Sequence, residues 1–329
     1  MGNGTFGSTV SYTPTDVVGG HKFTSVSAGY HHCLGIDDTG KLWAWGYNGY
    51  GQLGTGTTSN YSVPTAVLGE HVFVSVHAGE SYSLGLDIDG KAWAWGYNYY
   101  GQLGIGITGG NVLEPTAVLG DHVFTNIVIG YNHSIGLDTN GKLWSWGQNN
   151  SGELGTNNNV WHNSPTEVYG NHKFCYISAG WNFSHAIDEN GITWAWGTQT
   201  YGILGNATTT GSSLIPVVVY GNHNFVKIFS NYFHTVAIDA DGDSWSWGYN
   251  PTCELGYCGG ESQSIPQKID RGIEFSSFTC GYSHTLGIDV NGIVYGFGTM
   301  GNGQLLIASL SNVSSVSAGW YWSIGIIKP

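Results

Sequence analysis

The stretch KLWAWGYNGYGQLG, at residues 41–54, decides the fold because its tryptophan element returns along the chain at a nearly constant interval. The element is WAWG from residue 43, and its later copies begin at residues 93, 144, 194, 245 and 295, the last copy having changed to YGFG. The period is therefore 50 or 51 residues. A period of this length indicates one supersecondary unit used many times, each copy packed on the next. We interpret residues 1–329 as a single repeat domain.

A second mark precedes the tryptophan element in each unit and occurs seven times. It reads SAGY at its first occurrence, and its last residues are Tyr30, Glu80, Tyr131, Trp181, Tyr232, Tyr282 and Trp320. Segments around both marks, such as FTSVSAG, HHCLGID, KLWAWG and PTAVL, alternate large and small side chains, which is typical of short β-strands. Turns such as DIDG and DVNG favour the positive backbone angles of tight hairpins. Four antiparallel strands a unit, repeated radially, predict an all-β fold, a seven-bladed β-propeller with four-stranded blades of about 50 residues.

The two ends of the chain look like complementary halves of one unit. Residues 1–20 are similar to the second half of a unit, while the final SAGWYWSIGIIKP contains only a first half. We therefore expect N- and C-terminal strands to close the ring together in the last blade. The expected units are approximately 21–70, 71–121, 122–171, 172–222, 223–272 and 273–312, followed by a composite last blade of 313–329 with 1–20.

That last blade is expected to be the thinnest. It has no seventh WxWG segment, and the interval from Tyr282 to Trp320 shrinks to 38 residues. A plain blade of three strands accounts for the shortening. Alternatively, the blade has an open strand position, which a neighbouring chain in an assembly would fill by β-augmentation.

The charge balance excludes several classes of partner. Nine basic residues stand against 22 acidic ones, so this acidic chain has a net charge of −13. Binding to nucleic acid or to an anionic membrane needs clustered Lys and Arg, which the sequence does not contain. No apolar run approaches the ~20 residues that span a bilayer. We expect neither nucleic acid binding nor membrane insertion.

The sequence carries no enzyme motif. A nucleophile elbow, a phosphate-binding GxxxxGK loop and paired catalytic carboxylates outside the repeat are missing. Aspartates such as Asp87 in DIDG lack the ligand number of a calcium loop, and hairpin turns account for them. The GxHxF histidines, one in each of five units, lie on separate blades and do not form a metal site: His21, His71, His122, His172 and His223. We predict no enzyme activity, no metal and no cofactor.

The five cysteines include only one close pair. Cys253 and Cys258 lie in the loop PTCELGYCGG, where they either form a small disulfide loop or stay as thiols. Cys33, Cys175 and Cys280 fall in strand-like segments and are expected to be buried, inert thiols.

The string AGxxHTxxLxxxGxLWxWGxxxxGQLG is typical of repeats in the regulator of chromosome condensation family, which this chain resembles over essentially its whole length. The chain carries the string as CGYSHTLGIDVNG at 280–292 and KLWAWGYNGYGQLG at 41–54. The resemblance implies a seven-bladed propeller. It also places four histidines at the family's HT or HS position, where a structural hydrogen bond is expected: His32, His133, His234 and His284. It leaves the activity open, because function depends on surface sites rather than on the fold.

Members of that family have several uses. The founding member is a nucleotide-exchange factor that docks on chromatin, a role that a net charge of −13 disfavours. The plant ultraviolet photoreceptor uses GWRHT triplets, and the corresponding GWNFSH and GWYWSI lack the arginine. Secreted β-lactamase inhibitory propellers grip a protein with an aromatic-rich end. Bacterial surface proteins and phage virion proteins share the low-lysine, Gly-, Asn- and Thr-rich composition.

Aromatic residues supply the candidate binding sites. Ten of the fourteen tryptophans lie in WxWG strands, where we expect them to fill the space between blades. The first turns place six aromatic residues and Glu80 on one rim, with Trp322 beside them, and this ring either recognises a partner or plugs the channel mouth. A second set follows the WxWG strands and suits stacking on protein or sugar: Tyr47, Tyr50, Tyr97, Tyr99, Tyr100 and Tyr249.

These observations favour a non-enzymatic binding or structural propeller, extracellular or on a cell surface or virion, that recognises protein or glycan through its aromatic rims. The alternative is an intracellular, exchange-factor-like regulator of a small GTPase or a similar protein partner, with which a cytoplasmic location stays open. A disulfide between Cys253 and Cys258 would favour the exterior.

Overall fold

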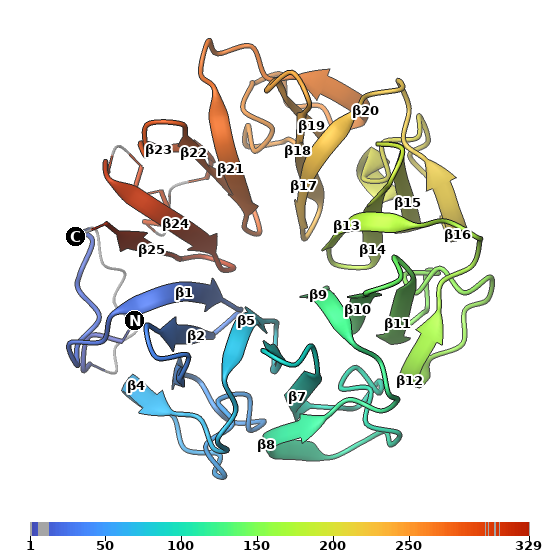
Figure 1. Ribbon diagram of the computed structural model, residues 1–329. Coiled ribbons are helices and arrows are strands. Elements are labelled where there is room, and N and C mark those ends of the chain that lie inside the picture. Colours follow the sequence, from blue (N-terminus) through green and yellow to red (C-terminus); the bar gives the residue numbers. More distant parts are fainter. Residues whose placement is uncertain are drawn as a thin grey trace.

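In the computed structural model, seven antiparallel sheets stand around a central channel (Figure 1). The structure describes residues 2–5, 13–299, 301, 303–305, 307–308 and 310–328. Five sheets have four strands each, and the described part of the chain adds one sheet of three strands and one of two. The predicted all-β propeller with blades of four antiparallel strands is therefore confirmed for these five sheets.

The strands follow one another in sequence within every sheet. The first sheet contains β1 (Phe23–Ala28), β2 (His32–Asp37), β3 (Leu42–Gly46) and β4 (Tyr61–Ala66). The second contains β5 (Phe73–Ala78), β6 (Tyr82–Asp87), β7 (Ala92–Tyr97) and β8 (Asn111–Ala117). The third contains β9 (Phe124–Ile129), β10 (His133–Asp138), β11 (Leu143–Gly147) and β12 (His162–Glu167).

The remaining sheets continue the pattern until strands are lost at the end. The fourth contains β13 (Phe174–Ala179), β14 (Phe183–Asp188), β15 (Thr193–Thr198) and β16 (Ser212–Val218). The fifth contains β17 (Phe225–Asn231), β18 (His234–Asp239), β19 (Ser244–Gly248) and β20 (Gln263–Lys268). The sixth contains β21 (Phe275–Cys280), β22 (His284–Asp289) and β23 (Val294–Gly298), and the seventh contains β24 (Val313–Ala318) and β25 (Ser323–Ile327).

Helix is almost absent from the described residues. A single turn of 3-10 helix, η1 (Thr200–Gly202), lies in the loop after β15. None of the described segments forms a helix with the length and apolar character needed to cross a membrane.

The Asp-x-x-Gly hairpins fix the register between the second and third strands of each sheet. Asp87 Oδ1 accepts the backbone N–H groups of Asp89 and Lys91 at 3.1 and 2.9 Å, and Oδ2 accepts Trp93 Nε1 at 2.7 Å. Gly90 completes the turn at φ 78°, a conformation that side chains disfavour. His71 then lies against the half-buried Trp93 ring, with 3.7 Å between centroids. The first tryptophan of WxWG is thus held by a carboxylate and an imidazole, and this histidine contacts an aromatic ring.

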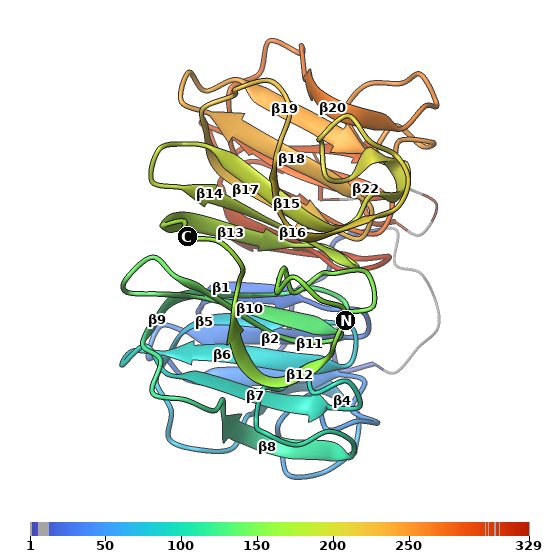
Figure 2. The same ribbon diagram turned by 90° about the vertical axis from the view of Figure 1, so that its right-hand side faces the viewer.

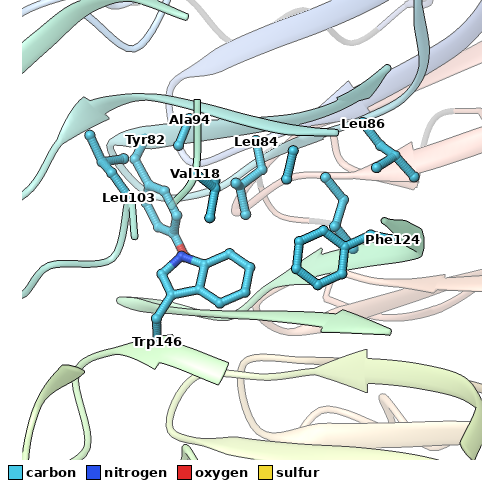
Figure 3. Close-up of a cluster of buried hydrophobic side chains, with 10 residues drawn as sticks. Tyr82, Leu84, Leu86, Ala94, Leu103, Val118, Phe124 and Trp146 are labelled. Atoms are coloured by element: carbon cyan, nitrogen blue, oxygen red, sulfur yellow. The ribbon is translucent and has the colours of Figure 1, made fainter. Parts of the chain in front are cut away.

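The second tryptophan fills the space between sheets, as the gap between the second and third sheets illustrates (Figure 3). Tyr82, Leu84 and Leu86 of β6 face Phe124 of β9 and Trp146 of β11, and each is at most 4 % exposed. The equivalent tryptophans are buried as fully: Trp45, Trp95, Trp196 and Trp247. If each buries ~200 Å² at ~25 cal/mol/Å², it contributes about 5 kcal/mol before chain entropy is subtracted.

Hydrogen bonds tie each sheet to the next through the GQLG-type loop. The Gln52 carbonyl accepts the Ser83 hydroxyl at 2.8 Å and Trp95 Nε1 at 2.9 Å. His32 Nε2 lies 2.9 Å from the same Ser83 hydroxyl. Because that hydroxyl donates to Gln52, the imidazole donates from Nε2 and its buried Nδ1 keeps the lone pair. The other histidines of the HT or HS position repeat the contact: His133 with Ser184, His234 with Thr285 and His284 with Ser323.

The ring closes through the innermost strands of the last and first sheets. Ser317 Oγ of β24 accepts the backbone N–H of Ala28 in β1 at 2.9 Å. Trp322 Nε1 donates to the Tyr30 carbonyl at 3.3 Å. These contacts join segments nearly 300 residues apart in sequence.

The N-terminal residues add a second closure. Gly4 N–H donates to the Ser62 carbonyl of β4 at 3.0 Å. A Cβ on Gly2 would lie 2.8 Å from Trp45 Nε1, as a Cβ on Gly54 would lie 2.9 Å from Trp95 Nε1. The N-terminus therefore supplies the loop that covers the tryptophan of the first sheet. The N-terminal strand expected within residues 1–20 is not formed by residues 2–5 or 13–20, and residues 6–12 lie outside the described residues.

The last two sheets are smaller than the predicted four-stranded blades. Fourteen residues separate Gly298 from Val313, whereas 26 separate Gly46 from Phe73, and the described residues of the shorter interval form no outer strand. The seventh sheet has only β24 and β25 in the described part of the chain, because residues 13–20 form no strand. In the described part of the chain, its second strand, β25, therefore has no WxWG strand paired with its outer edge.

Candidate binding site on the aromatic face

Both predicted aromatic sets lie on one side of the ring. β3 ends beside the start of β2, where His32 pairs with Gly46, so the first turn and the residues after the third strand share an edge. Figure 2 shows the strands crossing the thickness of the ring between two looped faces. The aromatic face is the one with Tyr30, Glu80, Tyr131, Trp181, Tyr232, Tyr282, Trp320, Tyr47, Tyr50, Tyr97, Tyr99, Tyr100 and Tyr249. The opposite side, with the Asp-x-x-Gly turns, is the hairpin face.

The first-turn side chains converge over the channel. The rings of Tyr30 and Trp320 lie 3.6 Å apart between centroids, and Tyr131 stacks on Trp181 at 4.3 Å. Tyr232 has a φ of 33° and is only 7 % exposed. The centroid of its ring lies 5.3 to 5.9 Å from those of three other first-turn residues: Trp181, Tyr282 and Trp320. Aromatic side chains therefore cover part of the channel mouth.

The second set continues this surface outward. Tyr50 lies 5.1 Å from Tyr97, and Tyr97 lies 6.4 Å from Tyr100. Tyr100 packs edge-on against Trp161 at 4.8 Å, beside the exposed Tyr99 at 5.0 Å. His31 joins this set to the first turns, because its ring lies 4.0 Å from Tyr30 and 6.3 Å from Tyr47. What the sequence suggested as two rims therefore forms a single aromatic surface on this side.

Phe233 connects the two sets on the other side of the channel, and sequence analysis missed it. Its ring lies 5.0 Å from Trp181, 5.9 Å from Tyr282 and 6.0 Å from Tyr249. Tyr201, also missed, lies 4.7 Å from Tyr249. Tyr201 takes the position of Tyr50 and Tyr100 in its unit, and Phe233 directly follows the first turn. Both could have been found by comparing equivalent positions of the units.

Trp322 differs from the other rim candidates. It lies directly before β25, at the place that His32 takes at the start of β2, because Ala318 pairs with Ser323 as Ala28 pairs with Cys33. Its indole donates to the Tyr30 carbonyl. Trp322 therefore joins the last unit to the first rather than standing free on the surface.

Beneath the first-turn aromatic residues, the innermost strands enclose a cavity of about 320 Å³. Its wall includes small hydroxyl residues, of which Ser27 Oγ accepts Ala78 N–H at 2.9 Å and Ser178 Oγ accepts Ser230 N–H at 2.8 Å. These hydroxyls link neighbouring sheets. The hydroxyl of Ser230, also in the wall, lies 3.1 Å from His185 Nδ1.

Two titratable groups of the second unit face this cavity. His77 is half-buried in the wall without a hydrogen bond in the described structure, and loss of hydration there lowers its pKa to about 4. Glu80 lies at the mouth, where its Oε1 accepts the Tyr131 hydroxyl at 2.8 Å. Burial raises the pKa of Glu80 above its usual range, against the effect of that hydrogen bond. The negative charge of Glu80 in turn adds to burial in raising the pKa of Tyr131.

Basic residues are segregated from the aromatic face. Eight of the nine adjoin strand ends at the hairpin face, and Lys227 is the third residue of β17. The eight are Lys22, Lys41, Lys91, Lys142, Lys173, Lys268, Arg271 and Lys328. The two ion pairs within the described residues, Lys142 with Glu167 and Lys268 with Asp243, also lie there. Within the described residues, no Lys or Arg side chain therefore adjoins the aromatic face.

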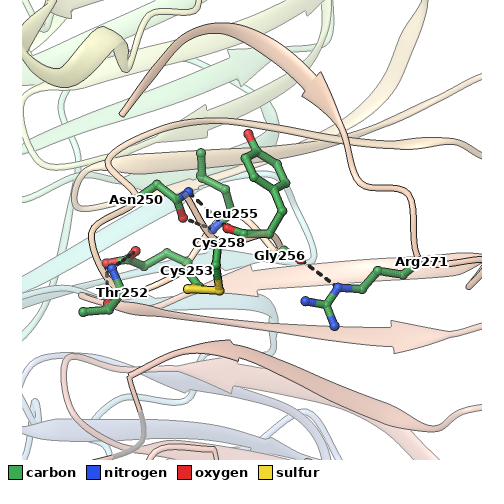
Figure 4. The surroundings of a disulfide bond; sticks show 9 residues. Asn250, Thr252, Cys253, Leu255, Gly256, Cys258 and Arg271 are labelled. Carbon is green, nitrogen blue, oxygen red and sulfur yellow. Dashed lines mark hydrogen bonds between the residues drawn. A yellow bond between two sulfur atoms is a disulfide. The ribbon is translucent and has the colours of Figure 1, made fainter. Parts of the chain in front are cut away.

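Cys253 and Cys258 are joined as a disulfide in the loop after β19 (Figure 4). Asn250 Oδ1 accepts the N–H of Leu255 within the same loop at 3.1 Å, and Arg271 Nε donates to the Gly256 carbonyl at 2.7 Å. Cys33 and Cys280 are buried thiols, whereas Cys175 is exposed, contrary to the burial expected for it. Within the described ranges, no group of three or more His, Cys, Asp or Glu is placed to hold a metal ion.

The repeat units match known family models. A model described as "Regulator of chromosome condensation (RCC1) repeat" matches residues 39–86, 89–137, 140–187, 190–238 and 241–288. The chain belongs to the RCC1 repeat family. A second RCC1 repeat model matches 23–52, 73–102, 124–153, 225–253 and 275–304, so the resemblance that the motifs indicated is confirmed.

Curated relatives carry RCC1 repeats in longer proteins. The ultraviolet-B receptor UVR8 of Arabidopsis thaliana is 26% identical over 314 residues, which cover 93% of this chain and 59% of the relative. The probable E3 ubiquitin-protein ligase HERC4 of Homo sapiens is 27% identical over 91% of this chain and 20% of the relative. The chain thus spans less than two thirds of the length of these relatives.

Two solved structures share the fold. Human WBSCR16 superposes with a TM-score of 0.87 at 19% identity, covering 96% of this chain and 89% of that one. Prp20p of Saccharomyces cerevisiae, described with its binding to Gsp1p and histones, superposes with a TM-score of 0.80 at 20% identity, covering 93% and 82%. Identity at this level supports the fold alone.

Proposed function

We propose that this RCC1-type propeller is a non-enzymatic binding module that holds a protein partner on its aromatic face. The observation that supports the proposal is the joining of both aromatic sets into one surface, from Trp181 and Phe233 across the channel mouth to Tyr100 and Trp161. Tyr and Trp dominate interface hot spots because they bury a large area at a low cost in side-chain entropy. The rigid sheets hold these side chains in place before a partner arrives.

A protein partner accounts for this surface better than a glycan. One structure of Prp20p is described with its binding properties to Gsp1p and histones, and another shows it bound to Kap60. All of these partners are proteins. The aromatic face also extends over several units, which suits a partner of protein size. A sugar would use a local patch such as Tyr99, Tyr100 and Trp161, and its binding is a separate outcome of the test below.

A photo-crosslinking amino acid placed at Tyr99 tests the proposal. Tyr99 on the aromatic face and Val290 on the hairpin face are both 56% exposed, so Val290 is a matched control. In the native source, the Tyr99 variant should crosslink to a defined protein that the Val290 variant does not capture. Equal crosslinking from both positions, or crosslinking from Val290 alone, would contradict the proposal. A glycan array checks the local sugar patch, and saturable binding that Trp161→Ala abolishes would replace protein with glycan as the ligand.

A second candidate is regulation of a small GTPase or a similar protein in the manner of an exchange factor. Family membership and the likeness to Prp20p favour it. Release of a fluorescent guanine nucleotide from small GTPases of the source organism is the direct measurement. Acceleration that is lost when Phe233→Ala alters the face would support this role, and unchanged release from every GTPase tried would remove it.

We also infer that the protein works in an oxidising compartment, which is the setting that its disulfide favours. Alkylation and mass spectrometry of protein from its native source measure the state of Cys253 and Cys258. An intact bond would support an extracellular or surface location. Two free thiols would support a cytoplasmic one and strengthen the GTPase candidate.

A further inference from the structure

The first-turn ring has one member that differs from the other six. Six units place Tyr or Trp at this position, whereas the second unit places Glu80. Tyr30 N–H donates to the Gly79 carbonyl at 3.0 Å, which sets Tyr30 beside Glu80 on one side. Tyr131 donates its hydroxyl to the carboxylate on the other side. The carboxylate thus stands between two phenol rings at the channel mouth.

Glu80 has little to balance its charge. In the described structure it accepts one hydrogen bond, from the neutral Tyr131, although a carboxylate has about four acceptor sites. Neither ion pair of the described residues includes Glu80. A half-buried carboxylate without a cation is costly, and this cost would fall when a cation arrives from outside.

From this arrangement we propose that the channel mouth receives one lysine or arginine side chain from a basic segment of the protein partner, with Glu80 as its counter-charge and Tyr30 and Tyr131 as its aromatic walls. The inference rests on the protein-binding function proposed above and names the chemistry of the partner. Aromatic faces attract cations through the negative face of the ring. A charge-assisted hydrogen bond to the carboxylate adds direction.

The charge distribution supports a cationic partner. The basic residues adjoin the hairpin face, and the chain carries a net charge of −13. A basic segment would therefore meet no repulsion on the aromatic face, and the overall field would draw it to the protein.

The size of the cavity supports a single side chain as the occupant. Its volume of about 320 Å³ is at the lower end of the ~300–1,000 Å³ that is usual for ligand pockets. The surrounding surface of Tyr50, Tyr97 and their neighbours would then carry the main chain on either side of the inserted residue. A free small amine would contact only the cavity and would leave this surrounding surface unused. We therefore assign a protein segment as the ligand.

Capped pentapeptides test this inference. Gly-Gly-Lys-Gly-Gly, its arginine counterpart and its norleucine counterpart are titrated into the full chain, and the indole N–H signals of Trp181 and Trp320 are followed by NMR. Norleucine matches lysine in shape without the charge. We expect the lysine and arginine peptides to shift both signals and the norleucine peptide to shift neither.

Two variants assign the effect to Glu80. Glu80→Gln removes the charge, and Glu80→Tyr installs the aromatic residue of the other units, so at least one should keep the fold. Both variants should lower the affinity for the lysine peptide about tenfold or more. Glu189→Gln, an exposed carboxylate on the hairpin face, is the matched control and should bind as the wild type does.

Several results would overturn the inference. These are equal binding of norleucine and lysine peptides, unchanged binding in both folded Glu80 variants, or n-butylammonium binding as tightly as the lysine peptide. The Tyr99 crosslinking experiment distinguishes failure of this inference from failure of the proposed function. If the crosslink persists in Glu80→Gln while peptide selectivity is absent, protein binding stands and only the cation pocket is withdrawn.

Discussion

The first five sheets and the last two are built from the same repeat but stabilised to different extents. The second strand of a complete unit, such as β6 or β10, is buried along its whole length, because a WxWG strand pairs with its outer edge. β25 has the same place in the last unit, yet each of its residues is partly or fully exposed. The comparison shows that the third strand, with its two tryptophans, turns a pair of strands into a blade.

The largest expected effect comes from removing a buried tryptophan. Trp146→Ala empties the gap between the second and third sheets and should lower the free energy of unfolding by about 4–5 kcal/mol. Phe297→Ala, at the equivalent position in the sixth sheet, should cost about 3 kcal/mol, since a smaller ring is lost. Denaturant titration measures both, with the exposed Trp161→Ala as control. A greater loss from Phe297→Ala would reverse the proposed order of blade stability.

Acid should next destabilise the four units whose second strand begins with a buried histidine. Burial lowers the pKa of His32, His133 and His284 to about 3 and that of His234 to about 4. The unfolded chain binds protons from about pH 6.5 downward, whereas the folded chain does not, so stability is fully present above pH 6.5 and declines below it. Each residue should contribute about 1.4 kcal/mol per pH unit over that range.

A variant isolates one of these histidines. Phe183 stands where His133 would stand in the fourth unit, so His133→Phe is a replacement that the fold already uses. Unfolding free energies measured from pH 7 to pH 4.5 should then fall less steeply by about 1.4 kcal/mol per pH unit. An unchanged slope would mean that His133 already titrates normally in the folded state.

A smaller effect is expected where the ring closes. Ser317→Ala removes the acceptor for Ala28 N–H and should cost about 1 kcal/mol, as should Ser178→Ala at the equivalent bond between the fourth and fifth sheets. Amide hydrogen exchange should already be faster in β25 than in β6, and Ser317→Ala should accelerate it in β1, β24 and β25. Equal protection of β6 and β25 would remove the distinction between the two regions.

The smallest change in stability is expected on the aromatic face. Tyr99→Ala should alter the unfolding free energy by less than about 0.5 kcal/mol, because the side chain is mostly exposed. Affinity for the crosslinked partner should nevertheless fall about fivefold or more, as for an interface aromatic residue. Calorimetry with the identified partner checks this, and unchanged affinity would place the contact elsewhere on the face.

Periodicity alone was enough to predict the sheets. The Asp-x-x-Gly turns and WxWG strands act between neighbours in sequence, so their roles could be inferred from one unit. The shortened end of the chain likewise predicted a thin last blade. The three-stranded sixth sheet was not predicted, because the missing outer strand leaves no motif and appears only as a shorter interval between β23 and β24.

The sequence by itself determined the repeat, the strand order and the aromatic residues at the first turns, because these depend on local patterns that recur. Only the tertiary structure decided which side chains meet. Closing the ring brings Tyr30 onto Trp320, and it places Phe233 between Trp181 and Tyr249. It also leaves Glu80 without a cation, since the basic residues adjoin strand ends at the other face. Such contacts depend on distances across the ring, and spacing along the chain carries no record of those distances.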